Sequence, residues 1–207
     1  MPQHRDGPPP QGRPAPTDEP IEPLIAARWS PRAIAEDPVE PEKLRAVFEA
    51  ARWAPSSFNE QPWRFLVATT RDPDWLARLR GYLLSGNAWA TRAPVLVVST
   101  YRTRFSGNDE LNPVAFRDLG AAEQNLVLQA YAEGLVAHQM AGFERERFRD
   151  ELVPDGFEVG SMTALGYPGD PEDLDEKLRA GELSPRQRKS LDDLVFGAEW
   201  GEPAELG

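Results

Sequence analysis

An α+β domain or a three-layer α/β/α domain is expected from three features of this 207-residue chain. Helical and strand-like patterns alternate along most of the sequence, the strand-like runs are few, and the helical patterns are long. One run, Val95 to Tyr101, is almost continuously apolar and β-rich, as in a strand that is covered on both faces. The pattern of elements alone does not choose between the two architectures.

Four elements are expected in the first half of the chain. They are a short helix at Ile21 to Ala27, a helix at Pro41 to Arg52, a strand at Arg64 to Thr70 and a helix from Asp72 to about Leu84. Pro41 suits the first turn of its helix, where the missing N–H is not needed. Apolar residues follow it at helical spacing: Leu44, Val47, Phe48 and Ala51. Asp72 is a suitable cap for the next helix.

Five elements are expected in the second half. They are the strand at Val95 to Tyr101, a helix from about Val114 to Glu133, a strand at Leu135 to Met140, a helix at Glu144 to Leu152 and a strand at Phe157 to Leu165. The helix at 114–133 carries a broad apolar band, which indicates a central and largely buried helix. Gly134 is suited to end this helix.

One domain is expected at residues 21–195, with a tail on each side. Residues 1–20 are rich in proline, glycine and charge and lack the apolar core of a signal peptide, so we expect a disordered tail. Residues 196–207 are expected to form an acidic C-terminal tail. No apolar run approaches the roughly 20 residues of a membrane span.

The composition limits the partners and the kinds of chemistry that we expect for this chain. A net charge of −11 argues against binding to nucleic acids or membrane surfaces, which are themselves anionic. With no cysteine and two histidines, the chain offers no thiolate nucleophile and no thiolate zinc site, and a histidine-based metal cluster is nearly excluded, so we expect no metal site. The absence of cysteine fits a reducing compartment, and we expect a cytoplasmic protein. If the chain is an enzyme, an organic cofactor is the natural carrier of its chemistry.

The segment Arg28-Trp29-Ser30-Pro31-Arg32 is the first candidate for ligand binding. It places two guanidiniums four residues apart beside a hydroxyl, near the expected end of the helix at Ile21 to Ala27. Arginine presents a planar fork of donors that matches phosphate oxygens. A solvated turn whose arginines balance an acidic surface is the simpler alternative.

A second candidate, which has more polar side chains, is the loop Pro55-Ser56-Ser57-Phe58-Asn59-Glu60-Gln61-Pro62-Trp63. Its hydroxyl and amide side chains offer donors and acceptors on short stems, and its prolines stiffen their presentation. Such an array suits the heteroatom edge of a planar ligand. The alternative is an ordinary connection between a helix and a strand.

Two further segments could contact a ligand. Met140-Ala141-Gly142 follows a strand, and its backbone N–H groups could meet a ligand atom, since Gly142 allows close approach. Arg186-Gln187-Arg188-Lys189 is a basic run in an acidic C-terminal region. A simple turn and a solvated surface are the respective alternatives.

Taken in order, these segments resemble the nitroreductase family of FMN-dependent oxidoreductases. The resemblance covers roughly residues 23–195 and is strongest in RWSPR at 28–32 and APSSFNEQPW at 54–63. DLGAAEQNLVLQA at 118–130 and ALGYP at 164–168 support it. It implies a mixed, mainly antiparallel sheet flanked by helices, within an intertwined homodimer that holds two FMN sites at the subunit interface.

The resemblance also implies a set of FMN-binding residues. The phosphate, the ribityl chain and the pyrimidine edge would be held by the segment with Arg28, Trp29, Ser30 and Arg32, and the phosphate also by Arg186 and Arg188. The partner subunit would contribute Pro55, Ser56, Ser57 and Asn59, with Gln61 bracing that loop. Asn87 would lie near the ring carbonyls, and the backbone at Met140, Ala141 and Gly142 would approach flavin N5.

The implied activity is hydride transfer from NADH or NADPH to flavin N5, and then reduction of a nitroaromatic, quinone or similar conjugated acceptor in a ping-pong cycle. A hydride acceptor at N5 needs no side-chain acid, so the shortage of histidine and cysteine is no handicap. The alternatives are a reductive dehalogenase or flavin-consuming oxidase, a non-catalytic flavin-binding sensor or store, and a structural homodimer without FMN.

Overall fold

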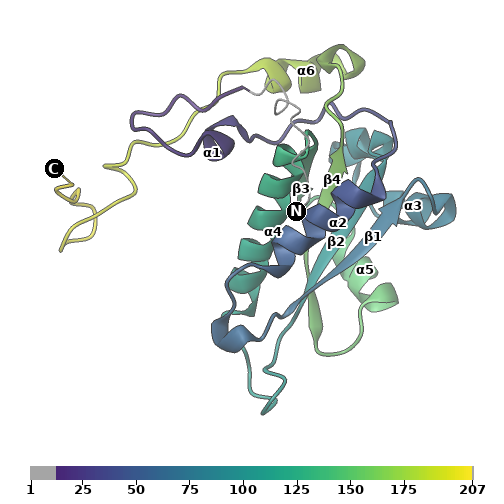
Figure 1. Ribbon diagram of the computed structural model, residues 1–207, viewed down its shortest axis with the longest axis horizontal. Helices are drawn as coiled ribbons and strands as arrows, with labels where there is room; N and C mark the ends of the chain where they lie inside the picture. The colour runs from purple at the N-terminus through teal and green to yellow at the C-terminus, as the bar shows by residue number, and fades with distance from the viewer. Residues whose placement is uncertain (1–12, 207) are drawn as a thin grey trace.

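The computed structural model describes residues 13–206, in which helices cover both faces of a four-stranded sheet (Figure 1). The strands are β1 (Trp63–Thr69), β2 (Val95–Arg102), β3 (Val136–Met140) and β4 (Phe157–Gly166). Their order in the sheet is β1-β2-β4-β3, and every pairing is antiparallel. The expected α+β class with three α/β/α layers is therefore confirmed.

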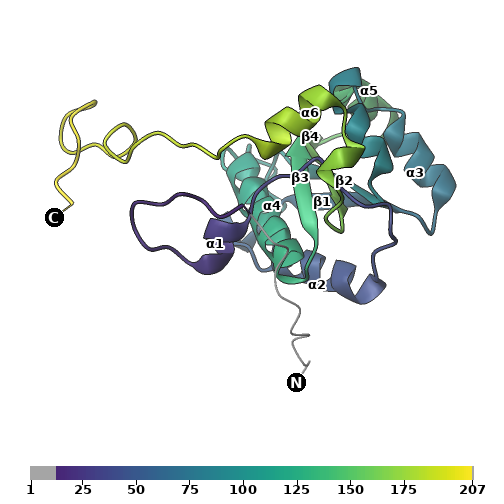
Figure 2. The same cartoon turned by 90° about the horizontal axis from the view of Figure 1, so that it is seen from above.

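Helices α2, α3, α4 and α5 form the two outer layers, and the structure describes six helices in residues 13–206. They are α1 (Pro23–Ala27), α2 (Pro41–Arg52), α3 (Pro73–Arg80), α4 (Ala115–Ala132), α5 (Arg145–Leu152) and α6 (Glu176–Leu183), with short 3-10 segments η1 (Ser57–Asn59), η2 (Ser85–Arg92) and η3 (Pro171–Asp173). Helices α2 and α4 pack on one face of the sheet, and α3 and α5 pack on the other (Figures 1 and 2).

Strand β2 divides the hydrophobic core into two parts. Val95 and Val97 pack with α2 and α4, whereas Leu96 and Val98 pack with α3 and α5. Because side chains alternate along a strand, a run of four apolar residues supplies both faces. This burial on both faces confirms the expectation for the run from Val95 to Tyr101.

Several local expectations are also confirmed. Pro41 opens α2, and the Asp72 carboxylate accepts a hydrogen bond from Trp75 N at 3.1 Å at the start of α3. Gly134 follows α4 with φ 77°, a left-handed conformation that favours glycine.

Two parts of the chain differ from expectation. Helix α3 ends at Arg80 rather than near Leu84, and the chain then turns into η2. Helix α6 was not expected, because Glu176–Leu183 contains Gly181 and few apolar residues. The Asp175 carboxylate caps α6 by accepting a hydrogen bond from Leu178 N at 2.8 Å.

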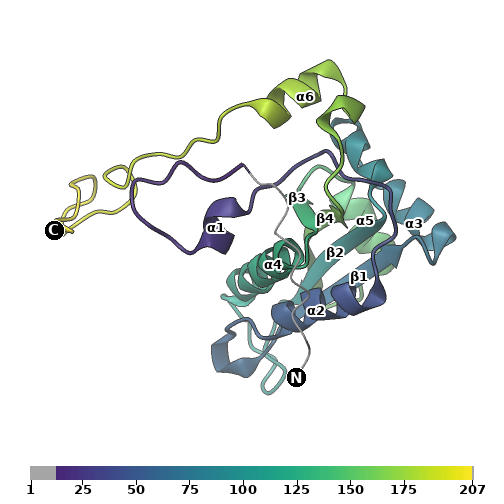
Figure 3. The same cartoon turned by 45° about the horizontal axis from the view of Figure 1, so that its top comes forward.

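The two ends of the described chain differ in how they contact the rest of the protein. Ala15 N donates to Ala26 O at 2.8 Å and Arg13 Nη2 donates to Leu183 O at 2.7 Å, so Arg13 and Ala15, which belong to the expected N-terminal tail, contact the rest of the chain. Residues 1–12 of the expected tail lie outside the described residues. After α6, the chain first passes α1, where Arg186 donates to Ala26 O, and its C-terminal end lies away from the three layers in every view (Figure 3). Within residues 13–206, no helix is long and apolar enough to cross a bilayer.

A substitution on β4 tests the packing between α4 and the sheet. A Cβ at Gly160 would lie 2.5 Å from Leu119 Cδ2 and closer still to Ser99 Oγ. Gly160→Ala is therefore expected to lower the free energy of unfolding by about 1–3 kcal/mol in urea titrations. Gly181→Ala is the control, because a Cβ there meets nothing within 4 Å. Equal effects of the two substitutions would contradict the packing described here.

Candidate functional site

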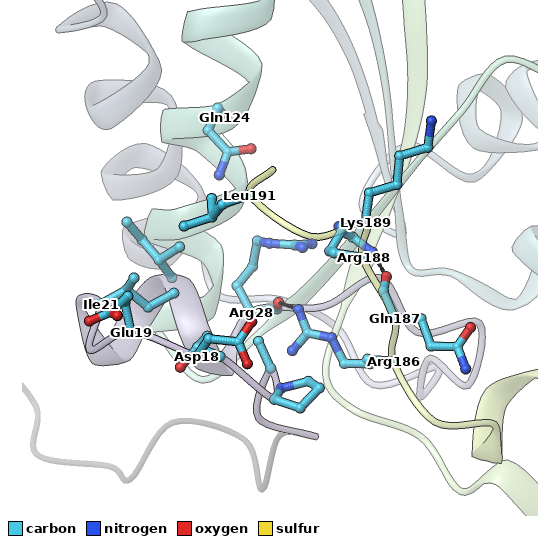
Figure 4. A pocket seen from close by; sticks show the side chains of 14 residues that line it. Asp18, Glu19, Ile21, Arg28, Gln124, Arg186, Gln187, Arg188, Lys189 and Leu191 are labelled. Atoms are coloured by element: carbon cyan, nitrogen blue, oxygen red, sulfur yellow. Dashed lines mark hydrogen bonds between the residues drawn. The ribbon is translucent and has the colours of Figure 1, made fainter. Parts of the chain in front are cut away.

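A pocket of about 420 Å³ lies between α1, α4 and the chain that follows α6 (Figure 4). Four cations line it, Arg28, Arg186, Arg188 and Lys189, together with the carboxylates of Asp18 and Glu19. Within residues 13–206, none of these cations forms a salt bridge with a carboxylate. The pocket is thus locally positive in a chain with a net charge of −11.

Burial and the neighbouring cations lower the pKa values of two arginines in this pocket. Burial lowers the pKa of Arg28, and the nearby charges of Arg186 and Arg188 lower it further. The pKa of Arg186 is lowered by burial and then by the charges of Arg188 and Arg13. Because each charged form is disfavoured here, an anion bound in the pocket would stabilise the cluster.

The arginines of the pocket have different hydrogen-bond partners. Arg186 donates from Nη1 to Arg13 O at 2.6 Å and to Ala26 O at 2.8 Å, and from Nη2 to Arg28 O at 3.0 Å. Arg28 donates to Ser30 Oγ at 3.2 Å, and Arg188 donates to Gln187 O at 2.7 Å. Arg186 therefore fixes the backbone around Arg28, whereas Arg28 and Arg188 keep most of their donors for a ligand.

The segment from Arg28 to Arg32 is held from two sides. The buried Glu182 carboxylate of α6 accepts hydrogen bonds from Arg32 N, at 2.9 and 3.0 Å, and from Ala33 N at 3.1 Å. On the other side, His138 Nδ1 lies 3.0 Å from Pro31 O. Since a carbonyl oxygen only accepts, this contact places a proton on Nδ1.

A series of contacts joins His138 to the end of β3. The imidazole packs against the Trp89 ring with centroids 4.7 Å apart, and Trp89 Nε1 donates to Asn87 Oδ1 at 3.3 Å. Asn87 Nδ2 donates to Gly142 O at 2.9 Å, and a Cβ at Gly142 would lie 2.5 Å from that nitrogen. The backbone N–H groups at 141–142 follow the last sheet pair, Met140 with Met162. These contacts connect the 28–32 segment with Asn87 and with the backbone from Met140 to Gly142.

The 55–61 loop is an ordered structure with unusual backbone angles. Phe58, Asn59 and Gln61 have φ of 53°, 55° and 49°, and such left-handed conformations cost roughly 1–3 kcal/mol for residues other than glycine. Side chains stabilise them, because Gln61 N donates to Ser56 Oγ at 2.8 Å and Gln61 Nε2 donates to Asn59 O at 2.9 Å. Ser57 N donates to the buried Asp118 Oδ2 at 2.7 Å.

Within one chain, this loop and the cationic pocket are separate. The loop lies at the N-terminal end of α4, beside Asp118, whereas α1 lies beside a later part of that helix (Figure 1). None of residues 55–61 lines the pocket. One connected group contains the other expected site residues: Arg28, Trp29, Ser30, Arg32, Asn87, Met140, Ala141, Gly142, Arg186 and Arg188.

Several residues of this arrangement were not identified from the sequence. Asp118 begins the 118–130 motif, but its bond to Ser57 requires the tertiary fold. Glu182 lies on the unexpected helix α6. Lys189 and Gln124 line the pocket, and the basic run at 186–189 was the available signal for Lys189.

The surroundings of His138 predict a pH-dependent stability. Burial lowers the pKa of His138 from about 6.5, assisted by the Arg32 charge and opposed by the hydrogen bond to Pro31 O and the Glu182 charge. The unfolded chain therefore binds a proton at a higher pH than the folded chain does. This contribution to stability is complete above about pH 6.5 and is lost as the pH falls towards the lower folded-state pKa.

His138→Asn removes this titrating group. The free energy of unfolding of the variant, measured in urea between about pH 5.5 and 7.5, is expected to vary less steeply with pH than that of the wild type. Identical slopes for the two proteins would contradict the assigned surroundings of His138.

The sequence is similar to those of known proteins. A model described as "Nitroreductase family" matches residues 25–167. An NADH dehydrogenase of Thermus thermophilus is 31% identical over 175 residues, which cover 69% of this chain and 84% of that protein.

Solved structures show the same fold. A crystal structure of an oxidoreductase containing FMN is 34% identical, with a TM-score of 0.85 over 90% of this chain and 96% of that chain. An FMN-dependent nitroreductase of Clostridium difficile is 27% identical, with a TM-score of 0.59 over 74% of this chain and 94% of that chain. Since the family model also matches more than half of the sequence, this chain belongs to the nitroreductase family.

Proposed function

We propose that this chain is an FMN-dependent oxidoreductase that uses NADH or NADPH to reduce a nitroaromatic, quinone or similar conjugated compound. The observation that carries the proposal is the pocket lined by Arg28, Arg188 and Lys189, which have no carboxylate partner within residues 13–206. A phosphate monoester carries about −1.5 to −2 charges, which suits such a cluster. The family and the relatives that contain FMN support the same conclusion.

Each side chain in the connected group has a role in this proposal. Arg28 and Arg188 bind the phosphate, while Arg186 positions Arg28 through its bonds to backbone carbonyls. Ser30 and Arg32 bind the ribityl chain and the pyrimidine edge, where the Arg32 cation stabilises negative charge. Bound FMN supplies the hydride chemistry, so the protein has to bind, orient and shield rather than provide an acid.

A homodimer completes the proposed site. In the proposed site a second copy supplies the 55–61 loop, and the separation of this loop from the cationic pocket of its own chain supports that arrangement. Large apolar side chains are exposed beside this loop and on the extended C-terminal segment: Trp53 at 72%, Phe58 at 90% and Trp200 at 94%. Exposure of this kind is typical of a surface that another chain covers.

Catalysis distinguishes this proposal from a flavin-binding sensor or store. The purified protein is expected to be yellow, and its flavin absorbance is expected to bleach when NADH or NADPH is added without oxygen. Addition of a quinone or a nitroaromatic should then restore the absorbance. A yellow protein that neither nucleotide bleaches would favour the non-catalytic alternative, and a protein without affinity for FMN would reject both.

The phosphate assignment predicts the behaviour of an arginine variant. Arg28→Ala combined with Arg188→Ala is expected to raise the dissociation constant of FMN by about a hundredfold or more, because two charge-assisted contacts are lost. Fluorescence quenching of added FMN measures this constant. The control is Arg71→Ala, which removes an exposed arginine outside the pocket. Equal affinity of the double variant and the control would exclude the assignment.

A further inference from the structure

Within residues 13–206 only two carboxylates are buried, Asp118 and Glu182, each with 2% of its surface exposed. Buried carboxylates require hydrogen-bond donors, because their charged form has lost its hydration. In both cases the donors include backbone N–H groups of a segment that belongs to the proposed FMN site or directly follows it, and Asp118 also accepts from the Arg117 guanidinium.

Glu182 fixes the half of the site that contains the cations. Its two oxygens accept the N–H of Arg32, and Oε1 also accepts the N–H of Ala33 at 3.1 Å. The chain that follows α6 continues to Arg186 and Arg188. Glu182 therefore joins the two segments whose cations meet at the pocket, although it does not line the pocket itself.

Asp118 fixes the other half. Its Oδ2 accepts the N–H of Ser57 at 2.7 Å, and its Oδ1 lies 2.9 Å from Arg117 Nη2. Ser57 directly precedes the left-handed residues Phe58 and Asn59, so the bond acts where the loop backbone is strained. Asp118 also lies in the first turn of α4, where the helix dipole favours a negative charge.

We propose that Asp118 and Glu182 are positioning residues of the FMN site, one for each half. This inference rests on the proposed function. Neither carboxylate supplies a group to the ligand, and each acts through the backbone that it holds. Because the two halves are separate within one chain, each site depends on Glu182 from one subunit and on Asp118 from the other.

Single substitutions test the positioning role. Glu182→Ala and Asp118→Ala are each expected to raise the dissociation constant of FMN by at least about tenfold. In the FMN-free protein, amide hydrogen exchange should accelerate at Arg32 and Ala33 in the first variant and at Ser57 in the second. Glu182→Gln and Asp118→Asn should recover part of both losses, because an amide oxygen still accepts a hydrogen bond.

The control is Glu176→Ala, which removes an exposed carboxylate from the same helix as Glu182. If an alanine variant does not fold, the glutamine and asparagine variants provide the comparison. Unchanged exchange at these three amides, or unchanged FMN affinity in variants whose exchange has accelerated, would overturn the positioning role.

Mixed dimers test the division between subunits. A dimer that pairs an Asp118→Ala chain with a Glu182→Ala chain has one site with both supports intact and one site with neither. It should therefore bind one FMN with wild-type affinity. A dimer that pairs the double variant with a wild-type chain has one support missing at each site, and it should retain no site of wild-type affinity.

The opposite pattern, with a wild-type site only in the second mixed dimer, would place both supports in one chain and overturn the division. A wild-type protein that binds no FMN would reject the proposed function instead. The amide exchange measurements would still decide whether the two carboxylates hold these segments, so the two failures are distinguishable.

Discussion

The candidate site depends on cations that the fold holds close together against their mutual repulsion. Arg28, Arg186, Arg188 and Lys189 line one pocket, and within residues 13–206 no carboxylate pairs with any of them. Burial and mutual repulsion lower the pKa of Arg28 and of Arg186. The cluster persists because the fold places it there: Arg186 is bonded to three backbone carbonyls, and Glu182 holds the segment that begins at Arg28. An anionic ligand would balance the charge that this arrangement leaves.

Several side chains outside the pocket hold the short segments of the candidate site in place. His138, Trp89 and Asn87 connect the 28–32 segment with Gly142, and α6 connects it with the basic residues that follow. The 55–61 loop has its own support at the start of α4. A site assembled from such braced pieces is preorganised, which reduces the entropy that binding would otherwise lose.

The sequence predicted the layers well because their signals are local. Val95 to Val98 are apolar on both strand faces, and Pro41, Asp72 and Gly134 mark the ends of helices through their own backbone chemistry. Helix α6 escaped prediction because Glu176–Leu183 is not strongly amphipathic. The backbone partners of Arg186 also could not be predicted, since a guanidinium offers the same donors to a phosphate as to backbone carbonyls. Only tertiary packing shows that its nearest partners are Arg13 O, Ala26 O and Arg28 O.

A crystal structure of the protein grown with riboflavin 5′-phosphate would examine the whole arrangement at once. The phosphate is expected against Arg28 and Arg188 of one copy, with the 55–61 loop of a second copy on the opposite side of the ligand. Ligand density at another place, or a site enclosed by a single chain, would contradict the account.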